Sequence, residues 1–129
     1  MNTSFAIAGV LAIAVGLVHS VLGERLVFRR MRAQGLIPTN GGEVLREPHV
    51  RIIWASWHIV TVLGCCLGVV LFWLAQPANA HLAGSWVVKA IAIAMLVSAA
   101  LVLVGTKAKH PGWAGLLAAA VFIFTGMGR

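Results

Sequence analysis

The sequence predicts an all-α integral membrane protein, an antiparallel four-helix bundle that forms a single membrane domain over residues 1–129. The first observation is composition, since 60% of the residues are hydrophobic and only 10% are charged. A water-soluble domain carries about 25% charged residues, so ordinary soluble folds and intrinsic disorder are excluded. The second observation is that four apolar stretches fill most of the chain, and the third is that most basic residues lie on one side of them.

The four apolar stretches are each long enough, or nearly so, to cross a membrane. A spanning helix needs about 20 mostly apolar residues. Residues 3–23, 52–75 and 82–105 contain one formal charge between them, on Lys89. Residues 112–127 form a shorter fourth span. The first stretch is not preceded by basic residues, so we expect a retained helix and not a cleaved signal peptide.

The distribution of Lys and Arg predicts the orientation. Eight of the ten basic residues lie in or beside the first and third loops, and none lies in the second loop. Short loops rich in Lys and Arg stay in the cytoplasm. We therefore expect residues 25–48 to form a cytoplasmic loop at a bacterial inner membrane, with both termini in the periplasm. The net charge of +7 then reflects topology and attraction to anionic lipid headgroups, with no role in binding nucleic acid.

The first loop and the helix contacts follow from local residue types. Residues 25–32 are expected to continue the first helix beyond the bilayer, and residues 43–47 to add one helical turn. Pro48 suits the first turn of the second helix, where its missing N–H costs nothing. Short connections should make sequence neighbours pack side by side. Small residues at steps of four predict close contacts of the first helix; they are Ala8, Ala12, Gly16 and Ser20.

The second span carries a polar and aromatic stripe at steps of three and four. Its members are Arg51, Trp54, His58, Thr61 and Cys65. At about 100° per residue these positions share one helix face. That face must meet protein or a wet cavity, because lipid would leave its polar groups unsatisfied.

Depth along the helices brings polar residues of two spans together. His19 lies six residues from Arg25, and His58 lies seven residues from Arg51. Both imidazoles should therefore lie roughly 9–11 Å inside the cytoplasmic boundary. Glu24 and Arg51 lie at the boundary, where they are able to pair. The candidate site consists of His19, Glu24, Arg51, His58 and His110, surrounded by Ser20, Trp54 and Trp113.

Two interpretations of this cluster involve a cofactor. Imidazole and carboxylate groups suit a transition metal such as Zn, Fe or Cu. The metal ligands would be His19, Glu24, His58 and His110, although their spacing matches no compact metal motif. Alternatively, His19 and His58 would be the axial ligands of a b-type haem in an electron-transfer protein. Neighbouring helices 8–10 Å apart leave little room for the macrocycle.

Two further interpretations need no cofactor. The pocket would bind a small organic molecule or a lipid headgroup, with Arg51 meeting an anion, Trp54 and Trp113 forming apolar walls, and the histidines moving protons. In the last interpretation the polar groups satisfy one another, and the protein is a non-catalytic scaffold or small-solute carrier. The sequence contains no Gly-rich phosphate loop, nucleophile elbow or Ser-His-Asp motif. It therefore identifies no particular reaction, and redox or enzymatic chemistry at the metal or ligand site is left open.

Two segments resemble an uncharacterised group of small bacterial membrane proteins with four predicted spans. They are HSVLGER at residues 19–25 and RIIWASWH at residues 51–58, within the pattern HSxLGER…RxxWxxWH. The likeness covers the first span, the first loop and the start of the second span, about half the chain. The resemblance implies a bacterial inner-membrane protein and no particular activity. A homo-oligomer is compatible with so small a bundle, but no motif specifies one.

Overall fold

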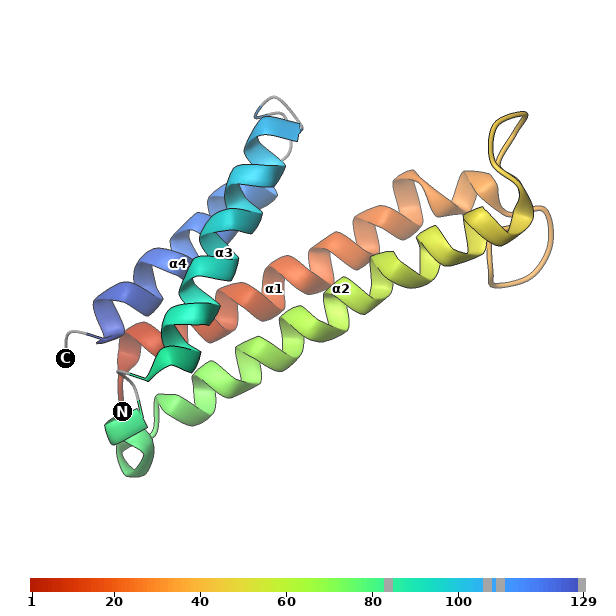
Figure 1. Ribbon diagram of the computed structural model, residues 1–129. Coiled ribbons are helices and arrows are strands. Elements are labelled where there is room, and N and C mark those ends of the chain that lie inside the picture. Colours follow the sequence, from red (N-terminus) through yellow and green to blue (C-terminus); the bar gives the residue numbers. More distant parts are fainter. Residues whose placement is uncertain (83–84, 106–107, 109–110, 128–129) are drawn as a thin grey trace.

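The computed structural model describes residues 1–82, 85–105, 108 and 111–127, and the regular elements of these residues are all helices. These residues form four long helices (Figure 1) and two short 3₁₀ helices. In chain order they are α1 (Thr3–Leu26), η1 (Phe28–Met31), α2 (Glu47–Leu74), η2 (Pro77–Leu82), α3 (Trp86–Gly105) and α4 (Gly112–Met127). The all-α prediction is confirmed. By length and apolar composition α1, α2 and α3 are able to cross a membrane, and α4 is a shorter apolar helix.

Asn2 fixes the start of α1 and ties it to two other helices. Its side-chain oxygen accepts a hydrogen bond from the Phe5 N–H at 3.3 Å, which caps the helix. Its side-chain nitrogen donates to the Gly126 carbonyl at 2.8 Å, and its backbone N–H donates to the Ala75 carbonyl at 2.7 Å. The start of α1 is therefore bonded to the C-terminal ends of α2 and α4.

The first loop differs from its prediction in two places. The expected helix through residues 25–32 is wrong, because α1 ends at Leu26 and a 3₁₀ turn follows, which buries Phe28 completely. The expected helical turn at residues 43–47 is also wrong. A tight turn closed by a Gly41–Leu45 bridge occupies this segment, with Gly42 at a φ of +65° that favours glycine. Helix α2 then begins with a proline in its first turn, as predicted.

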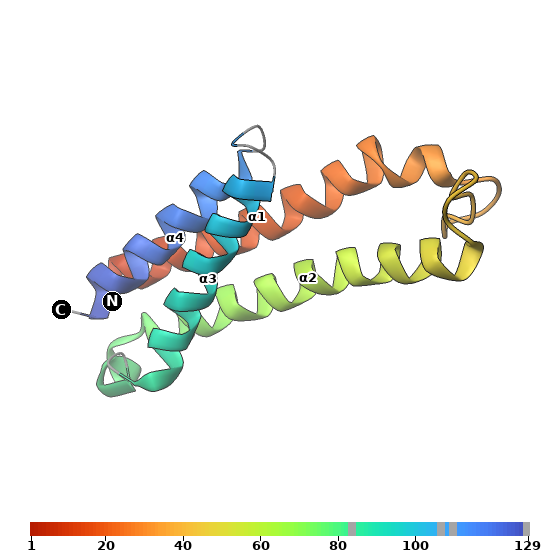
Figure 2. The same cartoon turned by 45° about the horizontal axis from the view of Figure 1, so that its top comes forward.

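Helix α1 is the central helix of the arrangement. It packs against both α2 and α4, and α3 packs mainly against α4 (Figure 1). Figure 2 shows that α2 and α3 diverge and that the α1–α2 hairpin extends well beyond the α3–α4 pair. We expected every pair of sequence neighbours to pack side by side. This is true of α1 with α2 and of α3 with α4, but not of α2 with α3.

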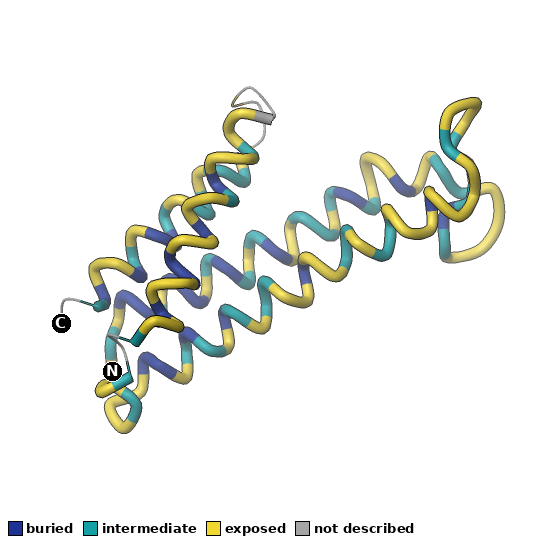
Figure 3. Tube along the Cα trace, in the orientation of Figure 1, coloured by how far each residue is buried: buried dark blue, intermediate teal, exposed yellow. Residues whose placement is uncertain are grey.

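The hydrophobic core lies at the end of the molecule where α1 begins and α4 ends (Figure 3). Phe5 is completely buried there, packed with Leu71 of α2, Val88 of α3 and Ile123 of α4. The small residues Ala8, Ala12 and Gly16 of α1 are buried, as close helix contacts require, whereas Ser20 is half-buried. The outer faces of the helices are exposed (Figure 3), and they carry many large apolar side chains.

Candidate functional site

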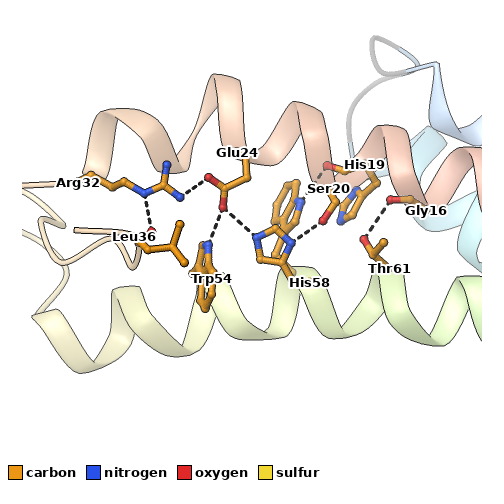
Figure 4. A network of polar contacts seen from close by, with 10 residues as sticks. Gly16, His19, Ser20, Glu24, Arg32, Leu36, Trp54, His58 and Thr61 are labelled. Atoms are coloured by element: carbon orange, nitrogen blue, oxygen red, sulfur yellow. Dashed lines mark hydrogen bonds and ion pairs between the residues drawn. The ribbon is translucent and has the colours of Figure 1, made fainter. Parts of the chain in front are cut away.

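A network of polar side chains joins α1 to α2 at the loop end of their hairpin (Figure 4). Glu24 lies at its centre and accepts hydrogen bonds from three side chains. The Trp54 indole N–H donates at 2.6 Å and His58 Nε2 at 3.0 Å, while Arg32 forms an ion pair with the other carboxylate oxygen. The carboxylate therefore receives donors from α2 and from the loop that follows η1.

The imidazole of His58 links Glu24 to a hydroxyl group. Its Nδ1 atom is hydrogen-bonded to Ser20 Oγ, and its Nε2 atom faces the Glu24 carboxylate (Figure 4). A neutral imidazole that donates from one nitrogen accepts at the other. With a neutral ring, the Ser20 hydroxyl donates to Nδ1, and the three side chains form one continuous Ser20–His58–Glu24 relay.

Aromatic packing holds the ring of His58 in place. Trp54 meets it edge-on, with ring centroids 4.9 Å apart, and Phe28 lies against it at 6.2 Å. Phe28 also contacts the Trp57 ring edge-on at 5.5 Å. By folding back after α1, the η1 turn places this phenylalanine between two aromatic side chains of α2.

The ring of His19 lies beside this relay and stacks on Trp57. The two rings are 4.3 Å apart and nearly parallel, and Trp57 Nε1 donates to the His19 carbonyl at 3.1 Å. Gly23 leaves room for the indole, because a Cβ atom there would lie 2.2 Å from Trp57 Nε1. Sequence reasoning missed Trp57, although its distances of three residues from Trp54 and four from Thr61 were a usable signal.

The predicted stripe on α2 faces α1 over most of its length. Thr61 Oγ1 donates to the Gly16 carbonyl at 3.0 Å, and Cys65 Sγ also lies near Gly16. Arg51 is the exception, because it pairs with Glu47 one turn away on an exposed surface. The expected Glu24–Arg51 pair is therefore replaced by one with Arg32, a residue that sequence reasoning did not place in the site.

The predicted metal and haem ligands gain no support from this arrangement. No group of three His, Cys, Asp or Glu residues suited to a metal ion occurs within the described part of the chain. Of the four proposed ligands, Glu24 and His58 are in contact, His19 stacks on a tryptophan, and His110 lies outside the described residues. Both ring nitrogens of His58 already have partners, which leaves neither for haem iron.

An apolar groove of about 500 Å³ runs between the α1–α2 and α3–α4 hairpins. All four long helices contribute to its walls, and among the described lining residues His19 and Ser98 carry polar side chains. Trp113 lies half-buried in the first turn of α4 and is not among the described residues that line this groove. The histidine therefore lies between the polar network and the groove.

The chain matches no family model, no curated protein and no solved structure. The resemblance to small bacterial membrane proteins stays a prediction, so function has to be argued from the geometry of the network and the groove.

Proposed function

We propose that this chain is a four-span integral protein of a bacterial inner membrane that binds a small, mostly apolar ligand in the groove between its two hairpins. Apolar side chains that face outward support the membrane location. Val62, Val69 and Val104 are 67%, 61% and 76% exposed, and a lipid environment would cover such surfaces at no cost in solvation. The shorter α4 would complete the bundle as a fourth span of about 24 Å.

The two ends of the molecule differ in charge, which supports the proposed orientation. The described N- and C-terminal residues lie together at one end (Figure 1), and exposed Arg25, Arg29 and Arg30 lie at the other. We therefore expect alkaline phosphatase fused after Met127 to be active, because that enzyme folds in the periplasm. The same fusion after Val44 should be inactive, and green fluorescent protein should give the opposite pattern. Active phosphatase after Val44 would contradict this topology.

The groove is the observation that carries the proposed ligand binding. Its volume falls within the range of roughly 300–1,000 Å³ that small-molecule sites occupy. Its apolar walls suit an apolar body, while His19 and Ser98 offer hydrogen bonds to one polar group. The favoured ligand is a membrane-soluble molecule with a single hydrogen-bonding head, such as a fatty alcohol.

Filling the groove should remove this binding. Ala94 lines the groove on α3, and the exposed Ala100 of the same helix is not among the described lining residues. In detergent, a fatty alcohol carrying a photoreactive diazirine should label the native protein saturably, at peptides of α1 and α3. The Ala94→Trp variant should lose the saturable component, and Ala100→Trp should keep it. Labelling that never saturates, spread evenly over all helices, would favour the non-catalytic scaffold instead.

A further inference from the structure

We propose that Ser20 is an activated nucleophile, with His58 as its general base and Glu24 as the group that orients the base. This activity is separate from ligand binding in the groove. It predicts cleavage of carboxylic esters at the loop end of the α1–α2 hairpin. The three residues come from two helices and lie in one hydrogen-bonded relay (Figure 4).

The geometry matches the roles that serine–histidine–acid triads require. Such triads occur on unrelated folds and in different chain orders, so they are recognised by contacts and roles. Ser20 Oγ contacts one imidazole nitrogen, and Glu24 Oε1 lies 3.0 Å from the other. Here Nδ1 faces the serine and Nε2 faces the acid. Either ring nitrogen is able to accept the proton while the opposite N–H stays bonded to the carboxylate.

The orienting group is itself held in place, as an efficient general base requires. Trp54 and Arg32 both bond the Glu24 carboxylate, and Phe28 packs on the imidazole. A hydrogen bond that only joins the two helices does not need such an arrangement. The Thr61 hydroxyl, for example, donates directly to a backbone carbonyl of α1. Ser20 is half-buried, and the side chains of His58 and Glu24 are 27% and 28% exposed, so reagents are able to reach the relay.

Hydrolysis of a carboxylic ester at this relay needs no reactant other than the ester and water. Ser20 Oγ attacks the ester carbonyl carbon while its proton passes to His58 Nδ1. The bond from that carbon to the alcohol oxygen then breaks, and the leaving alkoxide takes the proton from Nδ1. Water then gives a proton to the same nitrogen and attacks the acyl carbon. The bond from that carbon to Ser20 Oγ breaks, Nδ1 returns the proton to Oγ, and a carboxylic acid is released. We expect membrane-soluble esters as substrates, and this expectation rests on the proposed location in the bilayer. The activation of Ser20 does not depend on that location.

A fluorophosphonate tests the activation directly. Its phosphorus forms a bond to an activated serine oxygen while fluoride leaves and the serine proton passes to the base. We expect intact-mass and peptide analysis of the detergent-purified chain to show one adduct, on Ser20. Ser56, an exposed serine of α2, should stay unlabelled. Ser20→Ala should abolish labelling, and His58→Gln should slow it about 100-fold or more, the contribution of a general base.

Controls separate activation from a structural role. Thr61→Val removes an interhelical hydrogen bond outside the relay and should leave the labelling rate of Ser20 unchanged. An unlabelled Ser20, or a rate that is the same in His58→Gln, overturns the proposal. Equal labelling of Ser20 and Ser56 in the native chain also overturns it. That comparison needs no variant, so it decides even where His58→Gln fails to fold.

Discussion

Glu24→Ala is expected to lower the free energy of unfolding by about 3 kcal/mol. The change leaves the Trp54, His58 and Arg32 donors without their acceptor, and each unsatisfied donor costs about 1 kcal/mol or more. The η1 turn and the following loop should loosen from α2, because the tie of Arg32 to the carboxylate is lost and the turn is then held by the packing of Phe28. Denaturant titration in detergent, followed by helical circular dichroism, measures the loss, and faster amide exchange at residues 27–46 locates it.

Glu47→Ala is the matched control for this prediction. Glu47 pairs with Arg51 one turn away, and its side chain is 53% exposed. Such surface pairs on a helix contribute about 0.3–0.5 kcal/mol, so this variant should unfold almost as the native chain does. Similar losses in the two glutamate variants would show that the network around Glu24 does not stabilise the hairpin.

The helices were predictable because their signal is local. Long apolar stretches identified all four, and the predicted fourth span coincides with α4. The end of α1 was not predictable, since burial of Phe28 against Trp57 and His58 decides it. The divergence of α2 from α3 was missed for a similar reason. Contacts of α1 with α4, which are distant in sequence, determine where the second hairpin lies.

Helix periodicity and depth along the helices predicted part of the site. They selected Ser20, Glu24, Trp54 and His58, all of which belong to the network. They did not select Arg32, because a helix continued through that residue would carry it about 12 Å from Glu24. The η1 turn brings it back, and such a turn leaves no periodic pattern. Depth also says nothing about which way a ring points, so the stacking of His19 could not be foreseen.

Gly68→Ala is expected to lower the free energy of unfolding by about 2 kcal/mol. Gly68 lies in the part of the α1–α2 hairpin that is remote from the polar network. A Cβ atom at Gly68 would lie 2.8 Å from the Gly9 carbonyl oxygen and 2.5 Å from Ile13 Cγ1. The isoleucine is able to change its rotamer, but the carbonyl belongs to the backbone of α1, so the two helices must separate. Overpacking of this kind costs about 1–3 kcal/mol. The same denaturant titration measures it.

Gly64→Ala provides the control, since it adds the same methyl group one turn earlier on α2. The nearest atom to a Cβ there is the Ala12 carbonyl oxygen at 3.9 Å, an ordinary contact. Alanine also favours the helix over glycine by up to about 1 kcal/mol, so this variant should be as stable as the native chain or more so. Because helix propensity changes equally at both sites, the difference between the two variants isolates the backbone contact. If Gly68→Ala is as stable as Gly64→Ala, the close approach of α1 and α2 at Gly9 does not exist.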